Sequence, residues 1–112
     1  MYQVIKFVFP FADDFNKSKP RPSVVISPSF GKYNQVVLAY ITTDVEDILD
    51  TDIFIDSSQT YFSNTGLRSS SVIKLHRLIT VTPSQIGEVI GVLPDKLILK
   101  LKKKLMKIFL LE

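Results

Sequence analysis

The stretch Pro20-Arg21-Pro22-Ser23-Val24-Val25-Ile26-Ser27-Pro28 decides the fold of this chain. Its centre, Ser23–Ser27, contains the β-branched run Val24-Val25-Ile26, which favours a strand. Pro28 ends that strand, because proline has no backbone N–H to donate to a sheet. A turn is predicted at Phe30–Asn34, and the apolar run that follows predicts a further strand at Gln35–Thr42.

Strand patterns continue on both sides of this central region. Residues Tyr2–Phe9 alternate in the manner of a strand with at least one buried face. Asp52–Asp56 alternates acids with isoleucines, which predicts a strand exposed on one face. Residues Val72–Leu75 and Leu78–Val81 predict one long or bent strand, and Ile86–Val92 a short final strand.

The C-terminal segment changes from strand to helix periodicity. Pro94 suits a first helical turn, and Asp95 complements the positive end of the helix dipole. Apolar residues then recur with helical spacing at Leu97, Ile98, Leu101, Leu105, Ile108 and Phe109. Leu99, Met106 and Leu110 fall on another side of this amphipathic helix. That second apolar side indicates either a dimer contact or packing into the same core.

Five or six short strands with one terminal helix predict a mainly β (α+β) fold. The expected architecture is a small SH3-like antiparallel barrel with a C-terminal amphipathic helix. The chain has 112 residues, which leaves room for one core, so we expect a single domain over residues 1–112.

The composition excludes several classes of protein and site. There is no cysteine and one histidine, so thiolate zinc sites and histidine-rich metal cages are excluded, and no metal or other cofactor is expected. Neither a G-x-x-x-x-G-K-[ST] loop nor a G-x-S-x-G motif occurs. No apolar stretch approaches the ~20 residues of a membrane span, and the start does not resemble a signal peptide. We therefore expect a cytoplasmic protein without a membrane partner.

Charge is distributed unevenly along the chain. The net charge is +3, but residues 44–56 carry six acids and no base, and residues 96–107 carry six lysines and no acid. The acids between Asp44 and Asp52 lack the glycine and final glutamate of an EF-hand loop. The lysines either attract a nucleic acid or an acidic protein, or form a solvated helix face.

Two side chains suit the chemistry of a phosphodiester. Arg21 stands between Pro20 and Pro22, whose fixed torsions restrict its backbone, and a guanidinium can clamp a phosphate through two hydrogen bonds. Thr42 and Thr43 end an apolar strand, so their hydroxyls can emerge where the core meets solvent. Taken alone, Arg21 resembles an ordinary surface arginine and Thr42 an ordinary strand-end threonine, so neither residue would be singled out without further context.

An ordered set of segments covers most of the chain. The segments are Phe9-Pro10-Phe11-Ala12-Asp13, Lys19-Pro20-Arg21-Pro22-Ser23-Val24-Val25-Ile26-Ser27, Val37-Leu38-Ala39-Tyr40-Ile41-Thr42-Thr43, Gly66-Leu67, Ser71-Val72-Ile73-Lys74-Leu75, Leu78-Ile79-Thr80-Val81 and Ile86-Gly87-Glu88-Val89-Ile90-Gly91-Val92-Leu93. Taken together, in this order and spacing, they resemble the MazF/PemK family of toxin endoribonucleases.

The resemblance implies an SH3-like barrel, a homodimer, and an antitoxin protein that occupies the RNA groove. It implies cleavage of single-stranded RNA at short sequences without a metal. Arg21 and Thr42 occupy the positions of the family's catalytic pair, and Asp13–Lys19 corresponds to its RNA-contacting loop. Two departures stand out: Tyr2-Gln3 replaces the usual Gly-Asp, and His76-Arg77 stands where an acid is common.

Metal-free RNA cleavage uses the neighbouring 2′-hydroxyl as nucleophile, so charge stabilisation, alignment and proton transfer are needed. Arg21 would stabilise charge and Thr42 would orient the 2′-hydroxyl or a phosphate oxygen. His76 is a candidate acid or base, because histidine side chains exchange protons near neutral pH. The sequence does not identify which group acts as the general base.

Binding of single-stranded RNA combines cations with stacking rings. The candidate RNA-binding residues are Phe15, Lys17, Lys19, Lys32, Thr43 and Arg77, with Phe11 and Tyr33 as further rings.

Two other functions are compatible with the same barrel. A catalytically decayed copy would act only as an RNA- or protein-binding module, and the two departures favour it. A gyrase-poisoning toxin would share barrel and dimer, but such toxins resemble one another in a tryptophan-containing tip, and this chain has no tryptophan.

Overall fold

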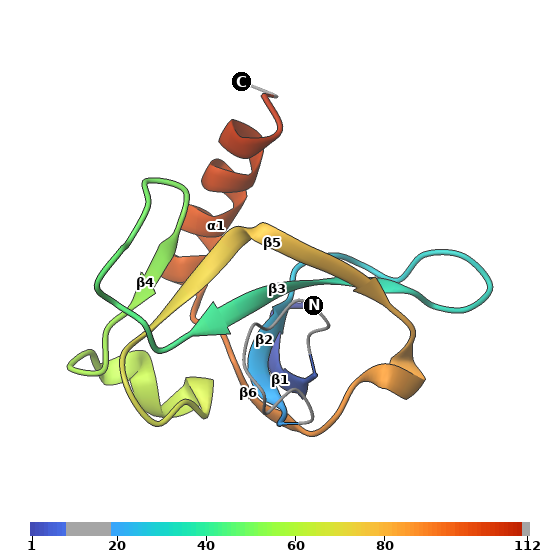
Figure 1. Cartoon of the computed structure of the whole chain (residues 1–112), viewed down its shortest axis with the longest axis horizontal. Coiled ribbons are helices and arrows are strands. Elements are labelled where there is room, and N and C mark those ends of the chain that lie inside the picture. Colours follow the sequence, from blue (N-terminus) through green and yellow to red (C-terminus); the bar gives the residue numbers. More distant parts are fainter. Residues whose placement is uncertain (9–18, 111–112) are drawn as a thin grey trace.

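The computed structural model of the chain describes residues 1–8 and 19–110. It contains a strongly curled antiparallel sheet and one long C-terminal helix (Figure 1). The elements are β1 (Gln3–Phe7), β2 (Arg21–Val25), β3 (Val36–Thr42), β4 (Ile53–Ile55), the 3-10 helix η1 (Thr60–Thr65), β5 (Ser71–Val81), the 3-10 helix η2 (Pro83–Gln85), β6 (Val89–Val92) and α1 (Asp95–Ile108). This is the strand-rich barrel with a terminal helix that the sequence predicts.

The strands lie in the order β4-β5-β3-β2-β1-β6, and each neighbouring pair is antiparallel. Strand β5 is the predicted long, bent strand. Its register against β3 shifts between Ala39 and Tyr40, where Ala39 faces Leu78 but Tyr40 faces Lys74. The extra residues let β5 bend over β3, as the gold arrow in Figure 1 shows.

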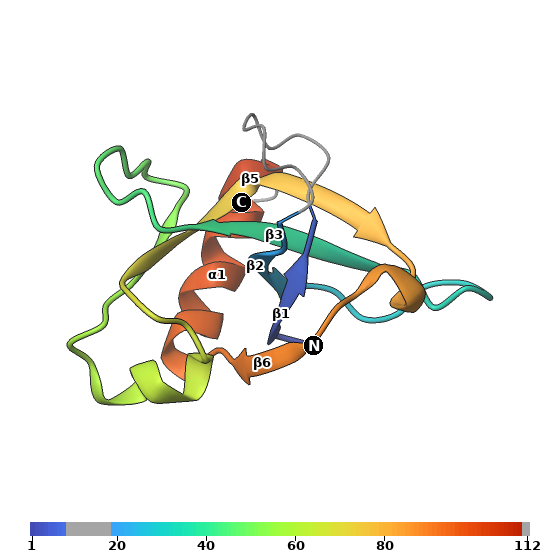
Figure 2. The same cartoon turned by 60° about the horizontal axis from the view of Figure 1, so that its bottom comes forward.

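Two hydrophobic clusters occupy opposite faces of the sheet. Neighbouring residues of a strand point to opposite faces, so Val24 enters one cluster and Val25 the other. The first cluster includes Leu97 and Leu101 of α1, which are 3% and 0% exposed. Figure 2 shows how α1 fits between the β3–β5 side and β6.

The helix buries one stripe and leaves another side uncovered. Ile98, Leu105 and Ile108 pack partly against the first cluster, as the helical spacing predicts. Phe109, expected on the same stripe, is instead 55% exposed, because the helix ends at Ile108 and Phe109 is its C-cap. Leu99, Met106 and Leu110 are also exposed, so they are not part of this core.

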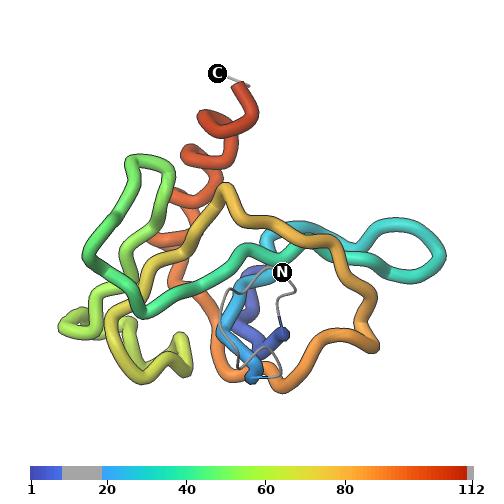
Figure 3. Tube along the Cα trace, viewed as in Figure 1, coloured from blue at the N-terminus to red at the C-terminus, as the bar shows by residue number. Residues whose placement is uncertain are grey.

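The hairpin between β2 and β3 extends from the body of the molecule, as the tube trace in Figure 3 shows. Its end is closed by an isolated bridge between Phe30 and Gln35, and Gly31 has a positive φ of 69° there. Among the residues that the structure describes, no helix is long and apolar enough to cross a membrane.

Candidate active site

Arg21 is the first residue of β2 and lies beside Phe7 of β1. On the other side, β2 pairs with β3 from Ser23 opposite Tyr40 onward. The pairing stops there because Pro22 has no N–H to continue it. Continuing the same register by two residues brings Thr42 opposite Arg21.

Residues directly opposite each other in an antiparallel pair have their Cβ atoms about 5 Å apart on one face. In this extended register the side chains of Arg21 and Thr42 would share a face of the sheet, and both residues are half-buried. The sequence predicts these two residues as a pair, and this pairing stays a prediction.

The Thr42 hydroxyl is held in a local turn. Its Oγ1 accepts a hydrogen bond of 3.1 Å from the backbone N–H of Asp44. One lone pair of the oxygen is thereby used, while the hydroxyl proton stays available to a ligand. Thr42 can therefore act as an oriented hydrogen-bond donor, which suits contact with a phosphate oxygen.

A cavity of about 700 Å³ adjoins Arg21. Residues from the start of β2, the end of β3, the η1–β5 connection and β6 form its walls, and they include Lys6, Lys19, Arg21, Pro22, Thr43, Gly66, Arg68, Ser69, Ser71 and Glu88. Four basic side chains (Lys6, Lys19, Arg21, Arg68) and one acid (Glu88) line it. Such a balance concentrates anions, so the cavity suits a phosphate-bearing chain.

Gly66 shapes one wall of this cavity. It ends η1 with a positive φ of 72°, a conformation that glycine adopts without strain. A Cβ atom at this position would collide with the backbone carbonyl of Ile90 in β6. The missing side chain therefore lets η1 lie against β6 and directs Leu67 and Arg68 along the cavity.

The other predicted RNA-binding residues are scattered. Lys19 and Thr43 line the cavity beside Arg21. Lys32 lies at the tip of the β2–β3 hairpin, at the opposite end of both strands from Arg21, and its Nζ lies 5.1 Å from the centroid of the Tyr33 ring. The structure therefore does not bring Lys32 to the cavity. Phe15 and Lys17, with the ring candidate Phe11, lie outside the described residues.

Arg77 stands nearer to the Arg21–Thr42 face than Lys32 does. Its guanidinium carbon lies 4.8 Å from the centroid of the Tyr40 ring. Tyr40 lies opposite Ser23, one step along the sheet from the expected Arg21–Thr42 pair. The Ser23 hydroxyl oxygen is buried there and has no hydrogen-bond partner among the described residues.

His76 has a buried acid as neighbour. Its side chain is 45% exposed, and its Nδ1 lies 3.9 Å from Oδ1 of Asp52, whose side chain is fully buried. The other oxygen, Oδ2, accepts hydrogen bonds from Lys74 Nζ at 2.7 Å and from the backbone N–H of Leu49 at 2.8 Å. Within the described part of the chain, Oδ1 has no hydrogen-bond partner.

Sequence reasoning missed several of these residues. Lys6, Arg68, Ser71 and Glu88 come from segments far apart in the chain. Ser71 and Glu88 lie in segments that carry the family resemblance, but nothing in those segments marks either residue as part of a cavity. The only signal that could have identified Asp52 is its place at the start of an alternating strand, which does not reveal its partners. Across residues 1–8 and 19–110, no group of three or more histidine, cysteine or acidic residues is placed to hold a metal ion.

The fold is similar to those of several solved proteins. The structure is similar to that of the Mycobacterium tuberculosis toxin MazF-mt6, with a TM-score of 0.73, 22% identity and coverage of 98% of both chains. It is also similar to an endoribonuclease from a mycobacterial species solved in complex with its cognate antitoxin. That match has a TM-score of 0.70 and 16% identity, and covers 99% of this chain and 94% of that one.

A third solved structure, another endoribonuclease from a mycobacterial species, matches with a TM-score of 0.65 and 16% identity over 96% of this chain and 88% of that one. No curated protein sequence matches the chain. The model of the PemK-like, MazF-like toxins matches residues 5–109. Because that match spans nearly the whole sequence, the chain belongs to the PemK-like, MazF-like family of toxins from type II toxin–antitoxin systems.

Proposed function

We propose that this chain is a sequence-specific endoribonuclease toxin that cleaves single-stranded RNA by attack of the 2′-hydroxyl, without a metal. Membership of the toxin family supports the proposal. The observation that supports it most is Arg21 on the wall of a cavity with four basic residues among the described ones, together with the β2–β3 register, which, extended by two residues, sets Thr42 opposite Arg21. We further propose that residues 1–112 form one toxin domain and that it acts in the cytoplasm.

The proposed reaction transfers the phosphodiester to its own ribose. The 2′-oxygen forms a bond to phosphorus while the bond from phosphorus to the 5′-oxygen breaks. The products are a 2′,3′-cyclic phosphate and a free 5′-hydroxyl. One proton leaves the 2′-hydroxyl and one reaches the departing 5′-oxygen, so the step needs a base and an acid.

In the proposed mechanism, Arg21 and Thr42 both donate hydrogen bonds to the reacting phosphate. The Arg21 guanidinium donates hydrogen bonds to the non-bridging oxygens, where negative charge grows in the transition state. The Thr42 hydroxyl, whose oxygen accepts a hydrogen bond from the Asp44 N–H, donates a hydrogen bond to the same phosphate group. His76 is our candidate for proton transfer; its Nδ1 lies 3.9 Å from Oδ1 of the buried Asp52.

The basic cavity would bind the RNA backbone beyond the scissile phosphate. Lys6, Lys19 and Arg68 are cations on its wall, and Thr43 adds a hydroxyl. Phosphate contacts of this kind make binding strongly dependent on salt. We keep Phe15, Lys17, Lys32 and Arg77 as proposed RNA contacts; of these, Lys32 would need an RNA that reaches the hairpin tip.

Two protein partners are part of the proposal. Leu99 and Met106 on α1, and Leu110 just beyond its end, are exposed apolar side chains, which supports a homodimer. Sedimentation of Met106→Lys at several concentrations tests this, since a lysine there would weaken an apolar contact and raise the monomer fraction. The second partner is a cognate antitoxin, as family membership suggests.

The test of activity is a cleavage assay on purified protein with a long single-stranded RNA in excess chelator. We expect fragments with cyclic phosphate and 5′-hydroxyl ends, and no cutting of an RNA whose 2′-hydroxyls are methylated. Intact RNA after prolonged incubation, with binding retained, would instead identify the chain as a decayed, RNA-binding module. Fragments with 5′-phosphate ends would refute the proposed chemistry.

A further inference from the structure

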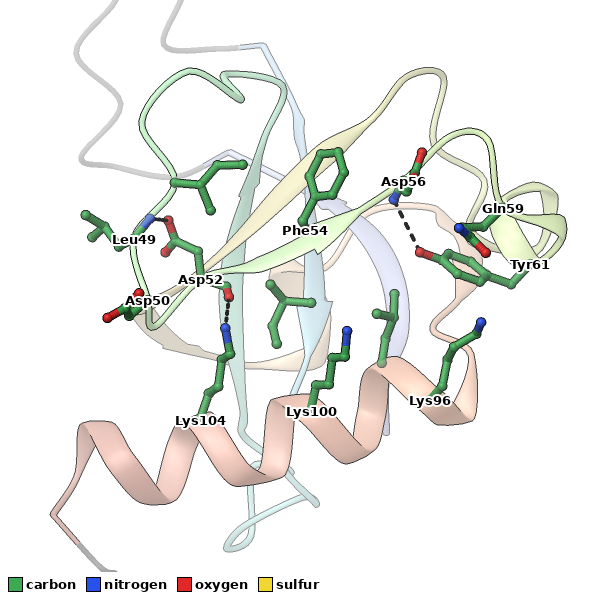
Figure 4. A pocket seen from close by; sticks show the side chains of 13 residues that line it. Leu49, Asp50, Asp52, Phe54, Asp56, Gln59, Tyr61, Lys96, Lys100 and Lys104 are labelled. Atoms are coloured by element: carbon green, nitrogen blue, oxygen red, sulfur yellow. Dashed lines mark hydrogen bonds between the residues drawn. The ribbon is translucent and has the colours of Figure 1, made fainter.

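A second cavity, of about 490 Å³, lies between the edge strand β4 and the helix α1. We call it the β4–α1 groove; it is lined by Ile48, Leu49, Asp50, Asp52, Ile53, Phe54, Asp56, Gln59, Tyr61, Lys96, Leu97, Lys100 and Lys104. Figure 4 shows Lys96, Lys100 and Lys104 pointing in a row from α1 toward β4. None of these residues lines the cavity beside Arg21.

On the outer edge of β4, which faces away from β5, the backbone groups of Phe54 point outward. The carbonyl of Asp52 accepts a hydrogen bond from Lys104 Nζ at 2.7 Å, and the N–H of Asp56 donates to the Tyr61 hydroxyl at 3.2 Å. Both groups point away from β5, which pairs on the other side. Backbone groups of an antiparallel strand alternate in direction, so those of Phe54, midway between them, also point outward.

The N–H and the carbonyl of Phe54 therefore form an open position on the sheet edge. No hydrogen bond to either group is found outside the β4–β5 pairing within the described chain. An unpaired edge of this kind pairs readily with the backbone of another extended chain.

Lys100 stands beside this open position. Lys104, one helical turn further on, holds the Asp52 carbonyl, and the Lys96 Nζ lies 5.3 Å from the centroid of the Tyr61 ring. Lys100, between them, has no hydrogen bond or ion pair with the described residues. Its ammonium group can therefore bind a carboxylate, which strengthens a hydrogen bond through charge.

We propose that the β4–α1 groove binds an extended acidic peptide segment of a protein partner. The segment adds to β4 through two backbone hydrogen bonds with Phe54, and an Asp or Glu side chain pairs with Lys100. Side chains alternate along a strand, so the acidic residue is a direct neighbour of the residue that pairs with Phe54.

A peptide fits this groove better than a nucleic acid does. The alternating N–H and carbonyl of Phe54 match a peptide backbone, whereas RNA offers phosphates along its whole length. Asp50 and Asp56 line the same groove and would repel such a polyanion. A peptide with a single carboxylate requires only one cation as its partner, and Lys100 supplies it.

The test is a titration of the ¹⁵N-labelled chain with acetyl-Val-Thr-Glu-Thr-Val-amide, followed by NMR. We expect the Phe54 amide signal to shift downfield as it gains an acceptor. Replacing Glu by Gln in the peptide, or Lys100 by Met in the protein, should weaken binding about tenfold. Lys103→Met, on the same helix but outside the groove, is the matched control and should bind normally.

A peptide with N-methyl groups on both threonines should not bind, because it cannot donate the backbone hydrogen bond. Equal binding of the Gln or N-methyl peptides, or no shift at Phe54, would overturn the inference. So would a single-stranded RNA that shifts the Phe54 signal and displaces the peptide. None of these readouts uses RNA cleavage, so the inference can stand or fall independently of the proposed nuclease activity.

Discussion

Replacing Asp52 by alanine should strongly destabilise the fold. The carboxylate is fully buried, and its Oδ2 binds both the Lys74 ammonium at 2.7 Å and the Leu49 N–H at 2.8 Å. Asp52→Ala leaves both donors without this acceptor. Removing one partner of a buried ion pair costs about 3–5 kcal/mol.

The expected cost lies near the lower end of that range. The Lys74 side chain is 15% exposed and keeps a hydrogen bond of 3.1 Å to the Asp47 carbonyl. Its ammonium group therefore retains one hydrogen-bond partner and some contact with solvent in the variant. His76 adds little, because 3.9 Å exceeds hydrogen-bond length. We therefore expect a loss of about 3 kcal/mol in the free energy of unfolding. For a domain of this size that lowers the melting temperature by about 12 °C.

A double-mutant cycle measured by urea unfolding isolates the pair. Asp52→Ala and Lys74→Met should each destabilise the protein, and the double variant should be more stable than the sum of the two losses by about 2 kcal/mol. Asp50→Ala, an exposed acid in the same loop, should change stability by less than about 0.5 kcal/mol. Additive losses, or a loss for Asp52→Ala no larger than for Asp50→Ala, would refute the assigned role of this ion pair.

Three further predictions concern other parts of the molecule. Gly66→Ala should cost about 3 kcal/mol in unfolding free energy, because it adds strain at a positive φ to a collision with the Ile90 carbonyl; an unchanged urea midpoint would contradict this. Ser58→Ala should raise the pKa of Asp56 toward its ordinary 3.8, since hydrogen bonds from the Ser58 N–H and hydroxyl lower it. Those bonds favour the ionised form, so their stabilising effect is present at neutral pH and is lost as the pH falls through the lowered pKa. An NMR carboxyl titration measures the shift, and an unchanged value would exclude the Ser58 hydroxyl as a contributor. Thr42→Val should reduce RNA cutting about 100-fold while Thr42→Ser retains most of it, because only the hydroxyl donates; equal rates for the two variants would remove the hydroxyl from the mechanism.

Local pattern was enough to predict the strands and the C-terminal helix of this fold, but not the 3-10 helices η1 and η2. The alternating and β-branched runs place all six strands, and the bend in β5 falls between the two halves that the pattern predicts, Val72–Leu75 and Leu78–Val81. The helix periodicity identifies both the buried stripe and the exposed side at Leu99 and Met106. These features depend on neighbours within a few residues, which the sequence displays directly.

Long-range partners could not be predicted in the same way. Lys74 binds an aspartate 22 residues away, and Lys104 binds the carbonyl of the same aspartate from 52 residues away. The strand order β4-β5-β3-β2-β1-β6 brings these groups together, and periodicity alone does not determine that order. The cavity beside Arg21 is likewise assembled from distant segments, so Lys6 and Arg68 carry no local signal of their place in it.

The central claim is that Arg21 stabilises the transition state of RNA cleavage. Single-turnover cutting of a single-stranded RNA in chelator, compared between the unaltered chain and Arg21→Ala, tests it most directly. Lys103→Ala serves as the charge-loss control outside the cavity. We predict that Arg21→Ala lowers the cleavage rate at saturating enzyme by about 10²–10³-fold while the control stays within about twofold. A saturated rate for Arg21→Ala equal to that of the unaltered chain would contradict the claim.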